Sequence, residues 1–304
     1  MTLGMCRPRR VLPGQTWFVT RRCTQRMFLL RPDEQTTQVY LYCLALAADK
    51  TGVRVLAFLA MSNHHHLVVH DPEGRLPEFY EHLHKFVAKA LNQRWKREEN
   101  FWSSEPTCAT LLVEPHDVIR KIVYTLANPV REHLVDLARH WPGASSLPPT
   151  MGKGTMQISR PAGFFRPKGP TPETVELELA LPEGFASREE WAEHLNQELA
   201  GIEQAAADER RERGKRIVGR RELTLVSAFD APESVEPSRT LRPSVAAVCE
   251  EARLTALDEL KSFWAHYREA LAALARQARD VLFPEGTYRL RRLGLPCAPS
   301  LPSG

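Results

Sequence analysis

The chain has 304 residues, 43% of them hydrophobic, and a formal net charge of +4. This length allows one sizeable core plus a second unit, and the hydrophobic fraction is ordinary for a globular protein. The longest apolar stretches, 39–48 and 53–61, are too short to span a bilayer, so we expect no membrane partner.

The cysteines and the N-terminal residues bear on the compartment. The six cysteines have no Cys-x-x-Cys spacing: Cys6, Cys23, Cys43, Cys108, Cys249 and Cys297. This scatter is typical of reduced thiols and offers no structural zinc site. No apolar segment follows the first arginines, so we expect no signal peptide and a cytoplasmic protein.

Positive charge is concentrated at the N-terminus, before the first acidic residue, Asp33. The arginines there include Arg7, Arg9, Arg10, Arg21, Arg22 and Arg26. Such an arm suits phosphate contacts, although a solvated tail explains residues 1–10 equally well. Residues 17–23 have the composition of a first strand, so either Arg21 or Arg22 should lie on the open face of a sheet.

The predicted elements follow one another in a recognisable order. They are a strand (16–23), a helix (34–50), strands (53–61 and 64–70), a helix (76–98), a strand (109–114) and a helix (117–128). The order β-α-β-β-α-β predicts an α+β fold of the ferredoxin-like type, an antiparallel sheet with two helices on one face. On the helix expected at 76–98, we expect His82 and His84 to be solvated.

Three consecutive histidines begin the strand expected at 64–70. Side chains alternate along a strand, so His64 and His66 share one face and His65 points to the other. Two imidazoles one pleat apart, roughly 6.5–7 Å along the strand, can close on one divalent ion. The spacing therefore predicts half of a metal site, although hydrogen-bonded histidines are a common alternative.

The helix expected at 117–128 carries candidate partners for this pair. Asp117 is a plausible N-cap, and we expect the helix to end near Asn128 because Pro129 disfavours helical geometry in the residue before it. Arg120, Tyr124 and Asn128 are spaced by four residues, so they share one helical face. A cation, a phenol and an amide would then face the histidine strand.

Taken together, these residues resemble a known family. Asn-His-x-His-Leu-Val-Val followed by Tyr-x-x-x-Asn-Pro-Val-Arg looks like the single-tyrosine HUH transposases, in particular the REP-associated tyrosine transposases. The resemblance covers about residues 12–146. It implies that His64, His66 and Asn128 bind Mg²⁺ or Mn²⁺ and that Tyr124 is the nucleophile. The family usually has a bulky hydrophobe between the two histidines, where this chain has His65.

The resemblance also implies a function. We expect an enzyme that cleaves and rejoins single-stranded DNA beside hairpins through a 5′-phosphotyrosine, in the bacterial cytoplasm at the nucleoid, as a monomer or homodimer. The predicted DNA-binding residues are Arg21, Arg22 and Arg120. The alternative is a non-catalytic, domesticated protein that binds repeated palindromes. A small-molecule hydrolase would need an acidic ligand at position 68, which is Val68.

The remainder of the chain carries no catalytic motif. We expect a transposase domain at 1–146, a Pro- and Gly-rich linker at 147–186, and a mainly helical basic region at 187–304. Ser187 and Glu190 predict the start of a helix running toward Arg213. The strongly basic run 210–221 is either a nucleic-acid contact or a solvated surface.

Overall fold

The computed structural model describes residues 8–147, 154–166, 168–234 and 243–299. Cys6 and Arg7 of the predicted basic arm, and part of the predicted linker, lie outside this range. In the first half, the helices and strands are β1 (Gln15–Arg22), η1 (Thr24–Arg26), α1 (Glu34–Thr51), β2 (Arg54–Ala60), β3 (His64–Asp71), α2 (Leu76–Trp95), β4 (Cys108–Leu112), α3 (Pro115–Arg131) and η2 (Ala138–His140). The second half contains β5 (Thr155–Ser159), β6 (Thr174–Glu178), α5 (Arg188–Arg213), α6 (Arg220–Leu225), β7 (Val245–Ala246), α7 (Glu250–Ala275) and α8 (Tyr288–Arg292).

The central sheet has the strand order β2-β3-β1-β4-β7. The first four strands pair antiparallel, in the ferredoxin-like order that the sequence predicts. β7 adds a fifth strand beside β4 in parallel, so the complete sheet is mixed. Val245 and Ala246 pair with Leu111 and Leu112, which brings the C-terminal region into the main sheet.

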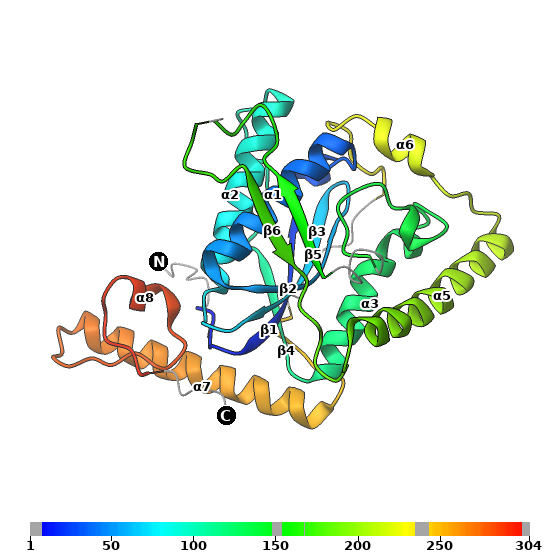
Figure 1. Ribbon diagram of the computed structural model, residues 1–304. Coiled ribbons are helices and arrows are strands. Elements are labelled where there is room, and N and C mark those ends of the chain that lie inside the picture. Colours follow the sequence, from blue (N-terminus) through cyan, green and yellow to red (C-terminus); the bar gives the residue numbers. More distant parts are fainter. Residues whose placement is uncertain (1–7, 148–153, 167, 235–242, 300–304) are drawn as a thin grey trace.

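The two faces of the sheet are covered by different helices (Figure 1). α1 and α2 pack together on one face, where Tyr40 and His84 reach the β3 residue His65. α3 crosses the opposite face, where Asn128 and Tyr124 reach His66, and α5 packs behind α3. The alternation predicted for β3 is therefore confirmed.

Local capping explains where the helices begin. α1 starts at Asp33, whose carboxylate accepts a hydrogen bond from the backbone N–H of Thr36 at 2.8 Å. α3 starts after Glu114, and Asp117 is the third helical residue of a capping box. The prediction of Asp117 as the N-cap is wrong, because its carboxylate accepts from Glu114 N–H within an already formed first turn.

The end of α3 also differs from the prediction. The helix continues through Pro129 to Arg131, although proline disfavours helical geometry before it. Pro129 and Val130 are buried, and the backbone N–H of Glu132 still reaches the carbonyl of Asn128 at 3.0 Å. Burial in the last turn therefore outweighs the local preference.

The range predicted as a linker contains regular structure. β5 and β6 form an antiparallel hairpin that packs against α1. Its buried side chains Ile158, Val175 and Leu177 belong to the same hydrophobic cluster as the main sheet. This part of the range is not an irregular loop, because alternating apolar residues between the prolines and glycines provide a strand face. The division into three domains stays a prediction.

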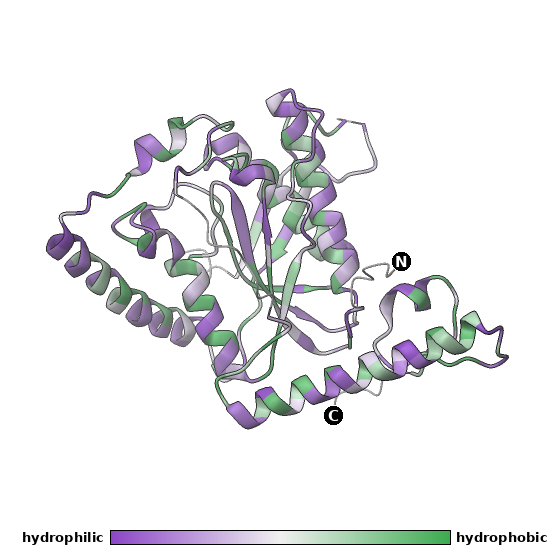
Figure 2. Cartoon of the chain, turned by 180° about the vertical axis from the view of Figure 1, so that it is seen from behind, coloured by the Kyte–Doolittle hydropathy of each residue, from purple (hydrophilic) through white to green (hydrophobic). Residues whose placement is uncertain are grey.

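α7 runs along one end of the sheet as a long, poorly buried helix (Figures 1 and 2). Of its side chains, Phe263 and Ala270 are buried. None of the helices in the described part of the chain is long and apolar enough to cross a membrane.

Candidate active site

The predicted metal ligands converge on the face of the sheet covered by α3. The Nε2 atoms of His64 and His66 lie 3.0 Å apart, and Nδ2 of Asn128 lies 3.3 Å from Nε2 of His66. β3 supplies both histidines and α3 supplies the asparagine. The structure thus brings together side chains that are 62 residues apart in sequence.

These donors suit a divalent cation. Two ligands about 2.1 Å from one ion at a right angle lie about 3.0 Å apart, which is the separation of the two Nε2 atoms. A half-turn of the Asn128 amide places its oxygen where Nδ2 stands, and amide orientation is assigned from hydrogen bonding. Two imidazoles and one amide oxygen are neutral ligands that fit Mn²⁺ or Mg²⁺.

Asn63 orients the first histidine. Its Oδ1 accepts a hydrogen bond from Nδ1–H of His64 at 2.7 Å, so the lone pair of His64 lies on Nε2 and faces His66. The Asn63 amide in turn donates to the carbonyl of Arg26 at 3.2 Å. Asn63 belongs to the sequence motif, but this orienting contact becomes apparent in the structure alone.

Tyr124 lies beside this group of ligands. Its ring meets the ring of His66 edge to face, with centroids 5.8 Å apart, and meets Phe18 in the same way at 6.0 Å. Phe18 also stacks on His66 at 5.4 Å. Tyr124 is half-buried, so its ring is fixed while the side chain retains access to the cavity.

Two cations lie against the Tyr124 ring. Nζ of Lys121 is 5.0 Å from the ring centroid, and Cζ of Arg131 is 5.8 Å from it. Burial, assisted by the neighbouring Arg120, lowers the pKa of Lys121, and Asp117 opposes that shift. Arg120 itself is exposed and is not among the residues that line the cavity. Helical spacing predicts Arg120 at this place, but the cation beside the Tyr124 ring is Lys121.

The two predicted DNA contacts on β1 point to different faces. Arg22 pairs across the sheet with His64, on the face that α3 crosses, and Arg21 pairs with His65, on the face that α1 and α2 cover. The guanidinium of Arg21 donates to Nδ1 of His84 at 3.0 Å and lies over the ring of Trp102. One of the two arginines, Arg22, therefore lies on the face opposite α1 and α2, as expected.

A cavity of about 1230 Å³ opens over Tyr124 and the three candidate ligands. Its cationic lining residues are Arg21, Arg22, Arg26 and Lys121, and its acidic ones are Glu105, Glu132, Glu222 and Glu233. Part of its wall comes from far along the chain, from residues within 218–234 and 243–246. The sequence predicts a transposase domain that ends at residue 146, so no sequence pattern indicated this wall.

The wall is attached by contacts to the N-terminal part of the chain. Arg26 donates to Oγ of Ser234 at 2.9 Å, and the backbone N–H of Phe28 donates to the carbonyl of Asp230 at 2.9 Å. Arg31 donates to the carbonyl of Val226 at 3.1 Å. Arginines of the N-terminal region therefore hold the wall in place.

The third histidine belongs to a separate, buried network. His65 and His84 face each other through their Nε2 atoms at 2.9 Å, and Nδ1 of His65 lies 2.9 Å from the hydroxyl of Tyr40. Burial lowers the pKa of His65 to about 3, with smaller contributions from Arg21 and His64. The expectation that His84 is solvated is wrong, because its ring lies in the core and bonds other polar groups there.

The direction of hydrogen bonding in this network follows from Arg21. A guanidinium only donates, so Nδ1 of His84 accepts and the proton of the neutral ring lies on Nε2. That proton is donated to Nε2 of His65, whose own proton on Nδ1 is donated to the oxygen of Tyr40. One always-charged residue thus fixes both tautomers.

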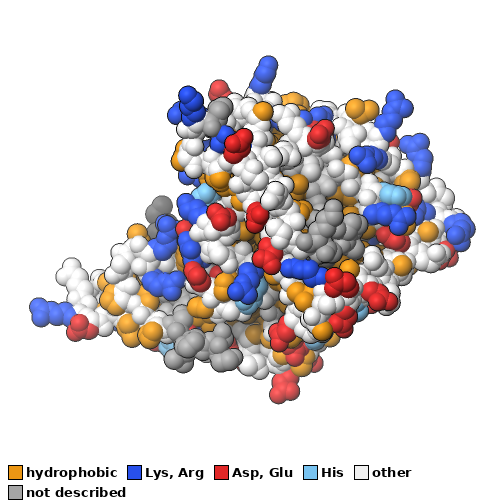
Figure 3. All heavy atoms as spheres, viewed as in Figure 1, with side chains coloured by type: hydrophobic (Ala, Val, Ile, Leu, Met, Phe, Trp, Pro, Cys, Tyr) orange, Lys and Arg blue, Asp and Glu red, His pale blue; other side chains and the backbone are white. Residues whose placement is uncertain are grey.

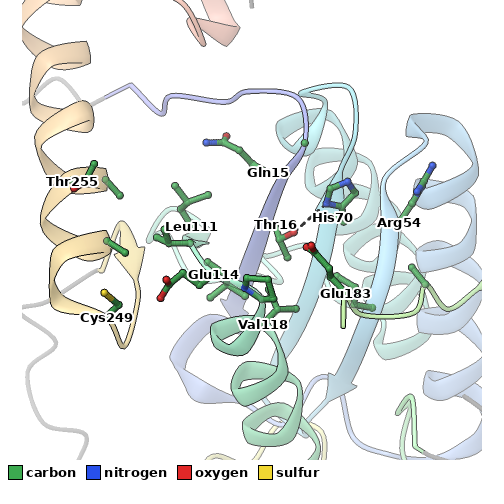
Figure 4. A pocket seen from close by; sticks show the side chains of 18 of the residues that line it. Gln15, Thr16, Arg54, His70, Leu111, Glu114, Val118, Glu183, Cys249 and Thr255 are labelled. Atoms are coloured by element: carbon green, nitrogen blue, oxygen red, sulfur yellow. Dashed lines mark hydrogen bonds between the residues drawn. The ribbon is translucent and has the colours of Figure 1, made fainter. Parts of the chain in front are cut away.

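A second cavity, of about 930 Å³, lies at the other end of β1 and β3 (Figure 4). There Oγ1 of Thr16 lies 3.1 Å from Nδ1 of His70, with Arg54 and Glu183 nearby. Burial, and next Arg54, lower the pKa of His70, whereas Asp71 and Glu183 raise it. The opposed charges give this cavity no evident preference for anions or cations.

One group of His, Cys, Asp and Glu side chains in the described residues is close enough to hold a metal ion: Glu114, His116 and Asp117. Both oxygens of the Asp117 carboxylate are already engaged, accepting from Glu114 N–H at 3.1 Å and from Val248 N–H at 2.8 Å. We therefore assign this group to the helix cap and to the attachment of the β7–α7 connection.

Two solved structures are similar to this chain. One is described as a REP-associated tyrosine transposase bound to a REP hairpin, with 19% identity and a TM-score of 0.40, over 48% of this chain and 82% of that one. The other is a putative transposase from Deinococcus radiodurans R1, with 17% identity and a TM-score of 0.28, over 36% and 84%. No protein-family model and no curated protein matches.

Proposed function

We propose that the protein is a transposase of the single-tyrosine HUH class, which cleaves and rejoins single-stranded DNA. The observation that carries this proposal is that His64, His66 and Asn128 lie close enough together to bind one ion. The Tyr124 ring packs against His66, one of these three residues. The same four residues carry the sequence motif, which supports the proposal. A packing tyrosine and two structural histidines would not need a shared cavity.

The residues of the chain divide the chemical work. The Tyr124 oxygen forms a bond to the phosphorus of the scissile phosphate, and the bond from phosphorus to the 3′ oxygen breaks. The phenol loses its proton to solvent, and the leaving oxygen takes one up as a free 3′-OH. The 5′-phosphotyrosine keeps the phosphodiester bond energy, so rejoining needs no external energy source.

His64, His66 and Asn128 would hold Mg²⁺ or Mn²⁺, which supplies positive charge to the scissile phosphate. Asn63 keeps the lone pair of His64 directed into the site. Lys121 and Arg131 lie against the Tyr124 ring and stabilise negative charge as it develops there. Arg22, on the same face as His64, is placed to contact a phosphate beside the scissile one.

The experiment uses labelled single strands that flank a hairpin, incubated with Mn²⁺ and the full chain. We expect a covalent adduct between the protein and the new 5′ end of the DNA. The other fragment should carry a 3′-OH that a polymerase can extend. Tyr124→Phe removes the hydroxyl and keeps the ring that packs on Phe18 and His66, so it should bind DNA without forming the adduct.

Tyr80→Phe is the matched control, because it removes a tyrosine hydroxyl on α2, which bonds Arg9, away from the cavity. It should form the adduct like the unmodified protein. Nicking by Tyr124→Phe without an adduct would identify a hydrolytic nuclease. Tight hairpin binding with no cleavage by the unmodified protein would favour the alternative, a non-catalytic DNA-binding protein.

A further inference from the structure

Apart from the cation that it would hold, the lining of the candidate active site carries no net positive charge. Its four cationic lining residues are opposed by four glutamates, and the guanidinium of Arg21 already donates to His84. In the described part of the N-terminal arm, Arg9 bonds Tyr80 and Arg10 pairs with Glu259 at 2.6 Å, and neither arginine lines the cavity. Affinity for DNA therefore needs a second source of positive charge.

That charge lies in the segment from the end of α5 to the start of α6. Residues 210–221 contain seven Lys or Arg and one acidic residue, Glu212. Figure 3 shows these side chains on the right-hand edge of the molecule, whereas acidic side chains gather below, over the start of α5. In Figure 2 the same end of α5 is strongly hydrophilic.

This basic segment is attached to the helix that carries Tyr124. The backbone N–H groups of Val218 and Gly219 donate to the carbonyls of His133 and Leu134, at 3.2 and 2.9 Å, directly after α3. Nζ of Lys215 lies 3.2 Å from Nε2 of His133. Val218 also lines the active-site cavity, so the basic segment passes its rim.

Except for the half-buried Arg210, the cations of the segment are exposed, and those with charged partners form surface pairs. Arg216 is 87% exposed and lies 3.7 Å from Glu222, and Arg213 and Lys215 share Glu209. Exposed pairs of this kind are weak, so they can give way to phosphate contacts. Arg220 and Arg221 are exposed at the first turn of α6.

We propose that this basic segment binds the phosphate backbone of a DNA duplex stem adjacent to the single strand in the active site, an inference that rests on the proposed function. A duplex carries one charge per ~1.7 Å of axis, about twice the density of one strand, so a row of exposed cations favours the stem. The cavity takes the unpaired strand, and the outer surface of α5 and α6 takes the paired one.

The test compares two DNA probes: a hairpin with a 5′ single-stranded flank, and a strand of the same composition shuffled so that it cannot pair. The triple variant Arg216→Gln, Arg220→Gln and Arg221→Gln removes three exposed charges that do not line the cavity. The matched control removes three exposed arginines of α7 and the turn after it, with Arg268→Gln, Arg276→Gln and Arg279→Gln.

We expect the triple variant to lose at least about tenfold in hairpin affinity, and the slope of log affinity against log salt to fall by about 2 to 3. The ratio of the two probe affinities should fall with it, and the control variant should keep both the slope and the ratio. An unchanged hairpin slope in the triple variant would overturn the proposal. Equal losses on both probes would show that the segment binds single strands.

A hairpin of RNA with the same sequence tests the partner. Tighter binding of the RNA stem, lost in the triple variant, would assign the segment to RNA and overturn the DNA assignment. The proposed function fails separately, because it requires the Tyr124 adduct, whereas this proposal is measured by binding alone.

Discussion

The two faces of β3 carry two pairs of histidines with opposite chemistry. On the α3 face, His64 and His66 approach each other in a cavity that opens to solvent. On the α1 and α2 face, His65 meets His84 at nearly the same distance, but in the core. Equal nitrogen–nitrogen separations therefore do not make equivalent sites.

The neighbours of each pair decide the difference. The first pair has an amide, a phenol and an open cavity beside it. The second has the cation Arg21 at one end and Tyr40 at the other, and these groups engage the remaining ring nitrogens. A cation next to the ring and full burial both oppose a metal ion, so the second pair is structural.

The largest expected effect separates the two faces directly. His64→Ala and His66→Ala should each reduce adduct formation about a thousandfold, because the divalent ion contributes several kcal/mol to the reaction. His65→Val should keep substantial activity when assayed below its unfolding temperature. Adduct yields over a Mn²⁺ titration measure this, and equal losses in the three folded variants would contradict the comparison.

The second effect concerns stability. His65→Val leaves Tyr40 and His84 without their partner in the core, which should cost about 2–4 kcal/mol of unfolding free energy. Adding His84→Leu should cost less than the sum of the two single changes, because both halves of the contact are then apolar. Urea denaturation measures the cycle, and strict additivity would mean that the rings do not interact.

The third effect is a pH dependence of stability on the buried face. Burial, followed by His65, Arg21 and Arg9, holds the pKa of His84 well below the ordinary value of 6.5. The unfolded chain therefore binds more protons below pH 6.5, so unfolding free energy falls as the pH falls, by at most ~1.4 kcal/mol per unit for one histidine. His84→Leu should show a shallower decline between about pH 7 and 5.5. Parallel curves for the two proteins would contradict this.

The smallest expected effect concerns the cation beside Tyr124 on the α3 face of the sheet. Lys121→Gln should reduce the cleavage rate at saturating DNA about tenfold, because Nζ lies against the Tyr124 ring. The matched control is Arg120→Gln, at the exposed neighbour of Lys121. It should change DNA affinity without changing the cleavage rate. A larger rate effect from Arg120→Gln would mean that the helix is rotated relative to the substrate.

Period-2 alternation was sufficient to predict which histidines share a face, because strand geometry leaves one answer. Choosing between Arg120 and Lys121 was beyond the sequence, since residues three and four before Tyr124 are both neighbours on a helix. The burial of His84 was missed because two polar rings satisfy each other, which apolar periodicity cannot reveal.

No local sequence pattern predicts the part of the cavity wall that comes from residues 218–234 and 243–246. β7 is two residues long, and residues 218–234 are attached to the segments after β1 and after α3 through single backbone and arginine contacts. Such contacts depend on where distant segments come to lie in space. The hairpin of β5 and β6 was hidden for a simpler reason, since proline and glycine around short strands resemble a loop.

The pairing of β7 with β4 has a consequence for biosynthesis. Residues 15–112 supply four strands of the sheet, but Val245 joins Leu111 after a further 133 residues have been made. At ordinary rates of translation this takes about ten seconds. During that interval a nascent chain can hold the histidines and Tyr124 without the wall that covers them. The newly made chain would therefore expose Tyr124 beside a folded sheet before the cavity around it is complete.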